Sequence, residues 1–219
     1  MKLSKGMAGL LLSTIVCPVV LAQNVVFDNT VHSINNNMHM LPAGETDSLE
    51  LGDDIWLAGG DRIGTSLTIL MTHRGSLAGT FDARIRFRAV DELSQAPGDI
   101  FYDSGIITNL AMVGGINEYT FAIPNVTLPD HMVWTIQGFN RQGSEGEFGP
   151  SYFNPATVGF SDDFFWMASS STSWVPYSWG GDPYANFAAK ITAVPEPATI
   201  VALAAGLGLI SRRGKKSSR

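Results

Sequence analysis

The chain has almost no cysteine, and this scarcity limits the chemistry open to it. Its 219 residues contain one cysteine, Cys17, which lies in the apolar N-terminal segment. Once that segment is removed on export, the rest of the chain has no thiol, which excludes disulfides and a cysteine nucleophile. A lipid-modified Cys17 is disfavoured, because Thr14 and Val16 stand where a lipoprotein signal needs a leucine and a small residue.

Histidine is also scarce, and catalytic motifs are missing. The four histidines are scattered, at His32, His39, His73 and His131. None belongs to an H-E-x-x-H pattern, and no G-x-S-x-G elbow offers a serine nucleophile. We therefore expect a body that is not an enzyme and needs no cofactor, with calcium as the one candidate ion.

Positive charge is concentrated at the two ends. Between Gln23 and Ala193 the chain has seven basic residues against nineteen acidic ones, a net charge of −12. A field of this sign repels nucleic acid, so no nucleic-acid partner is expected. It suits a cationic ligand, or simply solubility outside the cell.

Residues 23–193 show no helical periodicity and read as short strands separated by turns. Phe81, Ala83, Ile85, Phe87 and Ala89 alternate with charged residues, which is typical of a strand with one buried face. A second long strand is predicted over 131–139, and a closing strand over 185–193. Polar stretches at 28–37 and 143–150 are predicted to be loops. The predicted fold is an all-β antiparallel sandwich or jelly roll.

The N-terminus has the features of a signal peptide. Lys2 and Lys5 precede an apolar run from Met7 to Leu21, and Val20-Leu21-Ala22 forms a small-residue cleavage pattern before Gln23. We expect residues 1–22 to form the signal helix, and signal peptidase to cut between Ala22 and Gln23. The body is then exported.

The C-terminus, residues 194–219, combines three unlike pieces. Val194 and the triplet Pro195-Glu196-Pro197 lead into the apolar run Ala198–Ile210, and a cationic cluster follows at Arg212, Arg213, Lys215 and Lys216. A helix of about fifteen residues spans roughly 22 Å, short of the roughly 30 Å of bilayer hydrocarbon. We expect a marginal transmembrane helix with the cluster as its stop. An amphipathic helix packed on the body would need a polar face, which Thr199 alone does not supply.

This tail resembles the PEP-CTERM sorting signal of bacterial surface proteins. The resemblance implies a membrane protease-transpeptidase, exosortase, as partner, with Val194, Pro195, Glu196 and Pro197 as its recognition and processing motif. It implies transient membrane anchoring, followed by delivery to the cell envelope or the extracellular polysaccharide. The body is also similar to an uncharacterised domain of such proteins, through Ala83–Arg88, Pro97-Gly98 and Asn186–Ala189, which implies no activity.

Two acidic groups are candidate calcium ligands, since calcium binds six to eight oxygens and often uses carboxylates in loops. They are Asp53, Asp54 and Asp61, and Asp162 and Asp163. Neither group has the spacing of a calcium-binding loop. The alternative is that these aspartates cap turns, as aspartate often does.

Aromatic residues crowd the end of the body, and four of them are candidates for a sugar-binding platform. These four are Trp166, Trp174, Tyr177 and Trp179. Exposed rings would stack on polysaccharide, which makes a carbohydrate- or calcium-binding adhesive module the alternative function. The competing interpretation is that these rings are buried in the core or cover an open end of a sheet.

Overall fold

The computed structural model describes residues 22–41, 49–143, 145–168 and 173–196. Most of the two predicted terminal helices, residues 1–21 and 197–219, lies outside these ranges. Within them the chain forms twelve strands and no helix, so the all-β prediction is confirmed. The strands are β1 (Asn24–Asp28), β2 (Ser33–Met38), β3 (Glu50–Trp56), β4 (Ile63–His73), β5 (Gly79–Val90), β6 (Pro97–Met112), β7 (Gly115–Thr127), β8 (His131–Gln142), β9 (Phe148–Phe153), β10 (Phe160–Ala168), β11 (Val175–Tyr177) and β12 (Ala189–Val194).

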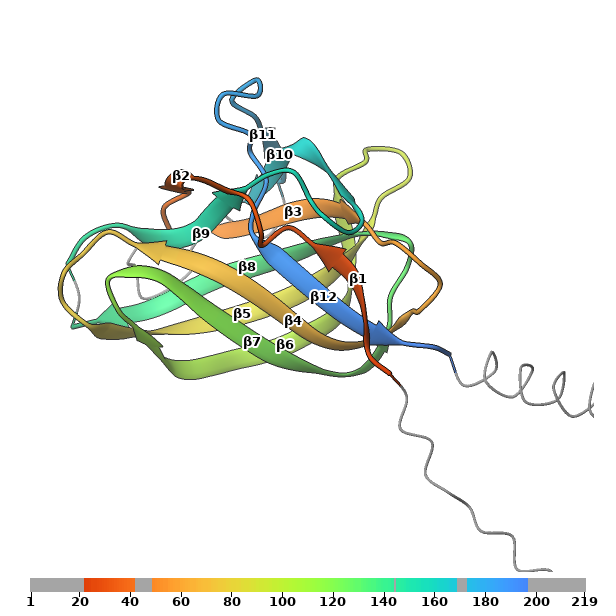
Figure 1. The fold of residues 1–219 in the computed structure, drawn as a ribbon, viewed down its shortest axis with the longest axis horizontal. Helices are drawn as coiled ribbons and strands as arrows, with labels where there is room; N and C mark the ends of the chain where they lie inside the picture. The colour runs from red at the N-terminus through yellow and green to blue at the C-terminus, as the bar shows by residue number, and fades with distance from the viewer. Residues whose placement is uncertain (1–21, 42–48, 144, 169–172, 197–219) are drawn as a thin grey trace, which may run out of the picture.

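The strands form two antiparallel sheets of six strands each, consistent with a β-sandwich (Figure 1). The first sheet has the order β1-β12-β4-β9-β2, and β7 pairs with the other edge of β4. The second has the order β11-β10-β3-β8-β5-β6. Here they are called the first and the second sheet.

The core lies between the sheets and follows the predicted alternation. Phe81, Ala83, Ile85 and Phe87 of β5 are buried in it, while the arginines between them lie on the outer face of the second sheet. β8 repeats the pattern with Met132, Trp134 and Ile136. Each large side chain removed from water stabilises the fold by about 1.5–3 kcal/mol.

Strand β12 lies between β1 and β4, so the last strand of the domain is internal to its sheet. Its residue Ala193 is opposite Asn24 of β1, and Val194 is opposite Ile63 of β4. The first and last strands therefore bring the two ends of the described body to one end of the sandwich (Figure 1). The opposite end holds the turn between β6 and β7.

Two predicted loops are strands in the structure. The stretch 143–150 includes the start of β9, whose six residues are all buried, and the stretch 28–37 includes most of β2. Asp53 and Asp54, expected in a turn, instead lie inside β3. In each case pairing with neighbouring strands overrides a weak local preference.

Candidate functional site

The outer face of the second sheet holds the largest group of charged side chains that the structure brings together. Arg84, Arg86 and Arg88 alternate along β5 and point to this face. The strand register sets Arg86 opposite Thr135 of β8 and, on the other side, opposite Asp103 of β6. Three of the seven basic residues of the body are thus gathered on one strand.

Glu50 of β3 joins this group, and its side chain is only 7% exposed although it lies on an outer face. Its carboxylate accepts hydrogen bonds from Arg86 Nη1 at 2.6 Å, from Arg88 Nη2 at 3.2 Å and from Thr135 Oγ1 at 2.5 Å. Every Glu50 oxygen has a partner. A polar network satisfied in this way is rigid.

Asp103 forms the other end of the network. It accepts hydrogen bonds from Arg84 Nε at 2.8 Å and from Arg86 Nε at 3.1 Å. These bonds, chiefly those from Arg84, hold the pKa of Asp103 well below its usual range. Arg86 therefore bridges two carboxylates. We call Glu50, Arg84, Arg86, Arg88, Asp103 and Thr135 the charged ladder.

The structure brings two of the four aromatic candidates, Tyr177 and Trp179, into contact with each other. Trp174 lies over the Arg88 guanidinium, 5.0 Å from its ring centroid, and so adjoins the charged ladder. Trp166 is 6% exposed. Tyr177 packs against the buried Phe165, and Trp179, 45% exposed, packs against Tyr177. Trp179 is thus the most exposed of the four candidates, whereas Trp174 and Tyr177 are half-buried.

The five acidic candidates also divide. Asp53 points to the interior, where its Oδ2 accepts the Phe187 N–H at 2.8 Å, while Asp163 accepts the Ala185 N–H at 2.7 Å. Both carboxylates therefore hold the backbone that leads into β12. Asp61 accepts a hydrogen bond from Asn24 at 2.5 Å, at the end of the sandwich where the domain starts and ends. Within the described ranges, no three histidine, cysteine or acidic side chains converge to hold a metal ion.

Asp54 and Asp162 lie near a bulge between β3 and β10, where the register shifts between Ser161 and Phe165. Burial raises the pKa of Asp54, and the charge of Asp162 adds to that effect. His131 opposes it through a hydrogen bond from its ring nitrogen to Asp54.

His131 forms a hydrogen bond to the carboxylate of Asp54. Its ring stacks on Trp56 with centroids 3.9 Å apart, and 25% of its side chain is exposed. His39 contacts the Tyr152 hydroxyl at 3.1 Å, and His73 contacts the Glu145 carbonyl oxygen at 3.0 Å. These three lie in separate places, so they form no common site.

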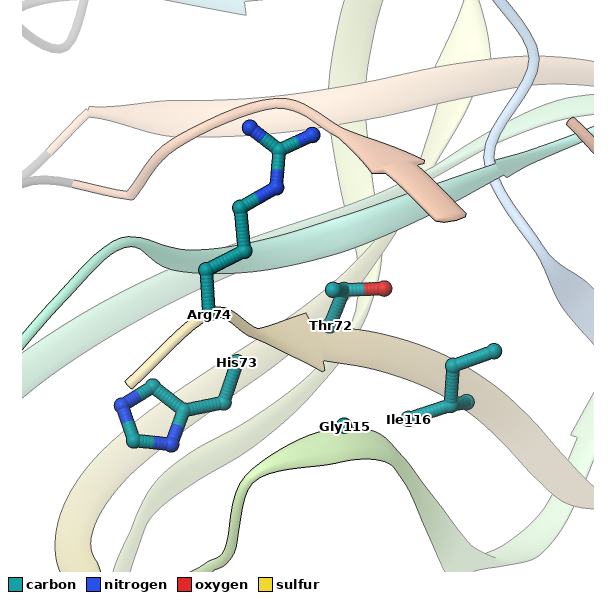
Figure 2. A pocket seen from close by; sticks show the side chains of 5 residues that line it. All are labelled: Thr72, His73, Arg74, Gly115 and Ile116. Carbon is teal, nitrogen blue, oxygen red and sulfur yellow. The ribbon is translucent and has the colours of Figure 1, made fainter. Parts of the chain in front are cut away.

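A hollow of about 440 Å³ opens where β4 ends and β7 begins. Thr72, His73, Arg74, Gly115 and Ile116 line it (Figure 2). Arg74 already pairs with Glu147 at 2.8 Å. The lining supplies no pair of groups suited to catalysis, which leaves the charged ladder as the stronger candidate.

The predicted processing sites lie at the edges of the described chain. Ala22 and Gln23 are exposed just before β1, and Glu196 is exposed two residues after β12 ends at Val194. Pro197, Arg212, Arg213, Lys215 and Lys216 lie outside the described residues. None of the described residues forms a helix with the length and apolarity that a membrane crossing needs.

The sequence analysis missed Glu50, Asp103 and Thr135, which complete the charged ladder. The one feature of the sequence that could have indicated these residues is the row of outward arginines on β5, because such arginines require acidic partners on the neighbouring strands. A comparison with protein-family models, curated proteins and solved structures finds no significant match. The chain's function must therefore be argued from its own residues.

Proposed function

We propose that the chain is an exported, non-catalytic β-sandwich protein that an exosortase-type enzyme sorts to the cell envelope or the extracellular polysaccharide. The observation that carries the proposal is the order of the C-terminal pieces: the Pro-Glu-Pro triplet, the apolar run and the cationic cluster. The flanking signal helix, the transmembrane-like helix and the jelly-roll-like topology belong to the same proposal.

The fold supports this proposal through the position of β12. Because β12 ends at Val194, the body is complete before the triplet begins. Glu196 is exposed, so an enzyme can reach the triplet without opening the sheet. Removal of the tail after the triplet therefore leaves every strand of the body in place.

Mass spectrometry of the mature C-terminus, in cells with and without the sorting enzyme, tests the proposal. We expect the mature protein to end near Pro195–Pro197 in the first case only. The variant Glu196→Gln should accumulate uncut, whereas Glu147→Gln, an exposed acid far from the triplet, should be processed normally. An intact Arg219 on the exported wild-type protein would contradict the proposal.

The charged ladder favours a second candidate function, the binding of an uncharged polysaccharide. Sugar hydroxyls both donate and accept, so planar guanidinium and carboxylate groups can bind them, and an aromatic ring can stack beside them. Arg84, Asp103 and Arg86 form such a row, and Trp174 adjoins it through Arg88. The network fixes these side chains in place, which reduces the entropy lost on binding.

Affinity electrophoresis in gels that contain neutral glucans tests this second candidate. We expect retardation of the wild type and its loss in Trp174→Ala. Trp179→Ala is the matched control, because Trp179 packs against Tyr177, whereas Trp174 contacts Arg88 of the charged ladder. Equal migration of wild type and both variants across a panel of glucans would exclude the candidate.

A further inference from the structure

Strand β7 presents a long free edge. Among the described strands it pairs with β4 alone, and from Gly115 to Ala122 this pairing runs without a register shift. Within the described ranges, no strand pairs with its other edge, which lies at the margin of the first sheet (Figure 1). A straight edge of this kind carries a row of unpaired N–H and C=O groups, onto which another strand can add.

The other sheet edges are interrupted. Strand β6 shifts register four times against β5 and contains Gly105 and Asn109 at φ of 65° and 58°. Strand β11 has three residues, one of them Pro176. The edge of β1 is covered where Asp28 pairs with Val158, and β2 shifts register between Ser33 and Met38. Strand β7 also shifts register, between Ala122 and Val126, and contains Pro124, but its first eight residues, 115–122, form an even edge.

The side chains of residues 115–122 also lack the usual protection. Edge strands commonly avoid pairing through lysine, proline or inward charges. Between Gly115 and Ala122 there is no lysine or proline, and Glu118 is the one charged residue. Ile116 is 43% exposed, and Thr120 and Ala122 are exposed on the same face.

We propose that β7 pairs with β7 of a second copy of this chain, antiparallel about a two-fold axis, so that the two first sheets become continuous. Symmetry requires that one residue faces itself. If that residue were Glu118, two carboxylates would lie directly opposite, which is destabilising. If it is Tyr119, Glu118 faces Thr120 of the second copy. A register centred on any other residue pairs five or fewer of residues 115–122, whereas these two pair seven, so charge selects the register centred on Tyr119. This register also sets Ile116 opposite Ala122 of the second copy.

The strength of this dimer follows from its size and charge. A contact of about seven residues on each strand buries less than the roughly 1,000 Å² expected of a stable interface, so the association is weak. Each body also has a net charge of −12, which repels the other copy. Salt screens this repulsion, with a Debye length of about 10 Å at 0.1 M. The dimer should therefore strengthen as salt is added.

The absence of cysteine from the exported body gives a direct test by disulfide trapping. Glu118→Cys and Thr120→Cys bodies are prepared separately, mixed and oxidised in 0.5 M NaCl. In the proposed register the two thiols face each other, with Cβ atoms about 4.5–5.5 Å apart. We expect severalfold more crosslinked dimer in the mixture than in either variant alone. Ile106→Cys, 59% exposed on the edge of β6, is the control.

A charge test on the unlabelled body checks the register independently. Thr120→Lys places an ammonium opposite Glu118 of the second copy, whereas Thr120→Glu places a carboxylate there; both lose the 2.9 Å hydrogen bond to Thr68. Sedimentation equilibrium should show association that is stronger than in the wild type for the lysine variant, by on the order of threefold, and weaker for the glutamate variant.

Efficient crosslinking of Glu118→Cys alone would overturn the register. Crosslinking of the mixture no greater than that of the control would overturn the pairing.

Discussion

Asp53 shows, at the scale of one residue, how the interior tolerates a carboxylate. It is fully buried, and its Oδ1 has no hydrogen-bond partner among the described residues. Burial raises its pKa well above the usual value, and the charges of Asp54 and Asp162 raise it further, while the Phe187 N–H lowers it. The protonated form is thus favoured by folding.

This pKa determines how stability depends on pH. Because folding raises it, the folded state binds more protons than the unfolded state from about pH 4 upward, and stability falls as pH rises through the folded-state pKa. We expect Asp53→Asn to remove this loss and to be more stable than the wild type at alkaline pH, by about 1–3 kcal/mol. Urea unfolding of both proteins between about pH 4 and 9 measures this difference in the free energy of unfolding. The exposed Asp182→Asn is the control, and parallel pH profiles for wild type and Asp53→Asn would contradict the assignment.

Glu50 is the residue on which the charged ladder depends. Glu50→Ala removes the carboxylate that Arg86 and Arg88 share, at sites where their side chains are 11% and 13% exposed. Arg88 then loses its ion pair, and Arg86 keeps only the pair with Asp103. Uncompensated charge at such sites is costly, so we expect a loss of about 2–4 kcal/mol in the free energy of unfolding. Glu147→Ala breaks an ion pair whose side chains are 46% and 52% exposed, and should cost less than about 1 kcal/mol. Similar losses for both variants in urea titrations would show that the ladder is not a buried network.

Sequence reasoning placed the three arginines of β5 on an exposed face but did not find their partners. Glu50 is 36 positions from Arg86, and their meeting depends on the order β3-β8-β5, which alternation within one strand does not encode. Within the part of the chain that the structure describes, the acidic candidates do not form a metal-binding group of three, for a related reason. Asp53 and Asp54 are adjacent in β3, so they point to opposite faces of the sheet.

At the scale of elements, strong alternation predicted strands well and weak alternation did not. Strand β5 confirms the strand predicted over 81–89. Its regular alternation of apolar and charged residues predicts a strand without any information about its neighbours in the sheet. The sequence of β9 contains Gly149 and Pro150, which both disfavour strands. Yet a Cβ at Gly149 would lie 1.7 Å from the His39 carbonyl oxygen, so the glycine permits a close approach of two chain segments. Tertiary packing thus determines this strand.

The internal position of β12 gives a prediction about the tail. A body that ends at Glu196 keeps β12, with Ile191 and Ala193 fully buried, and should unfold within about 2 °C of the longer chain that ends at Arg219. A body that ends at Ala188 lacks the strand between β1 and β4 and should not fold. Circular dichroism melting curves in mild detergent compare the three. A clearly lower melting temperature for the body that ends at Glu196 would mean that the tail packs on the sandwich, against the proposed function.

At the scale of the whole molecule, the acidic side chains of the described residues do not gather into a metal site. Asp53 and Asp163 bind backbone N–H groups, Asp54 binds His131, and Asp61 binds Asn24. We therefore expect millimolar calcium to leave the melting temperature unchanged, with magnesium as the control for general ionic effects. A calcium-specific rise would restore the adhesive-module interpretation, since a ligand that binds only the folded state stabilises it.

Asn24 and Ala193 lie opposite each other on adjacent strands, so the order of the strands along the chain can be changed by circular permutation. A short glycine-rich linker can join these two positions, and new ends can be opened at Val113-Gly114, in the turn between β6 and β7. Such a circular permutant keeps every neighbour in both sheets, because only the covalent order changes. The architecture would then persist although its first and last strands had become consecutive.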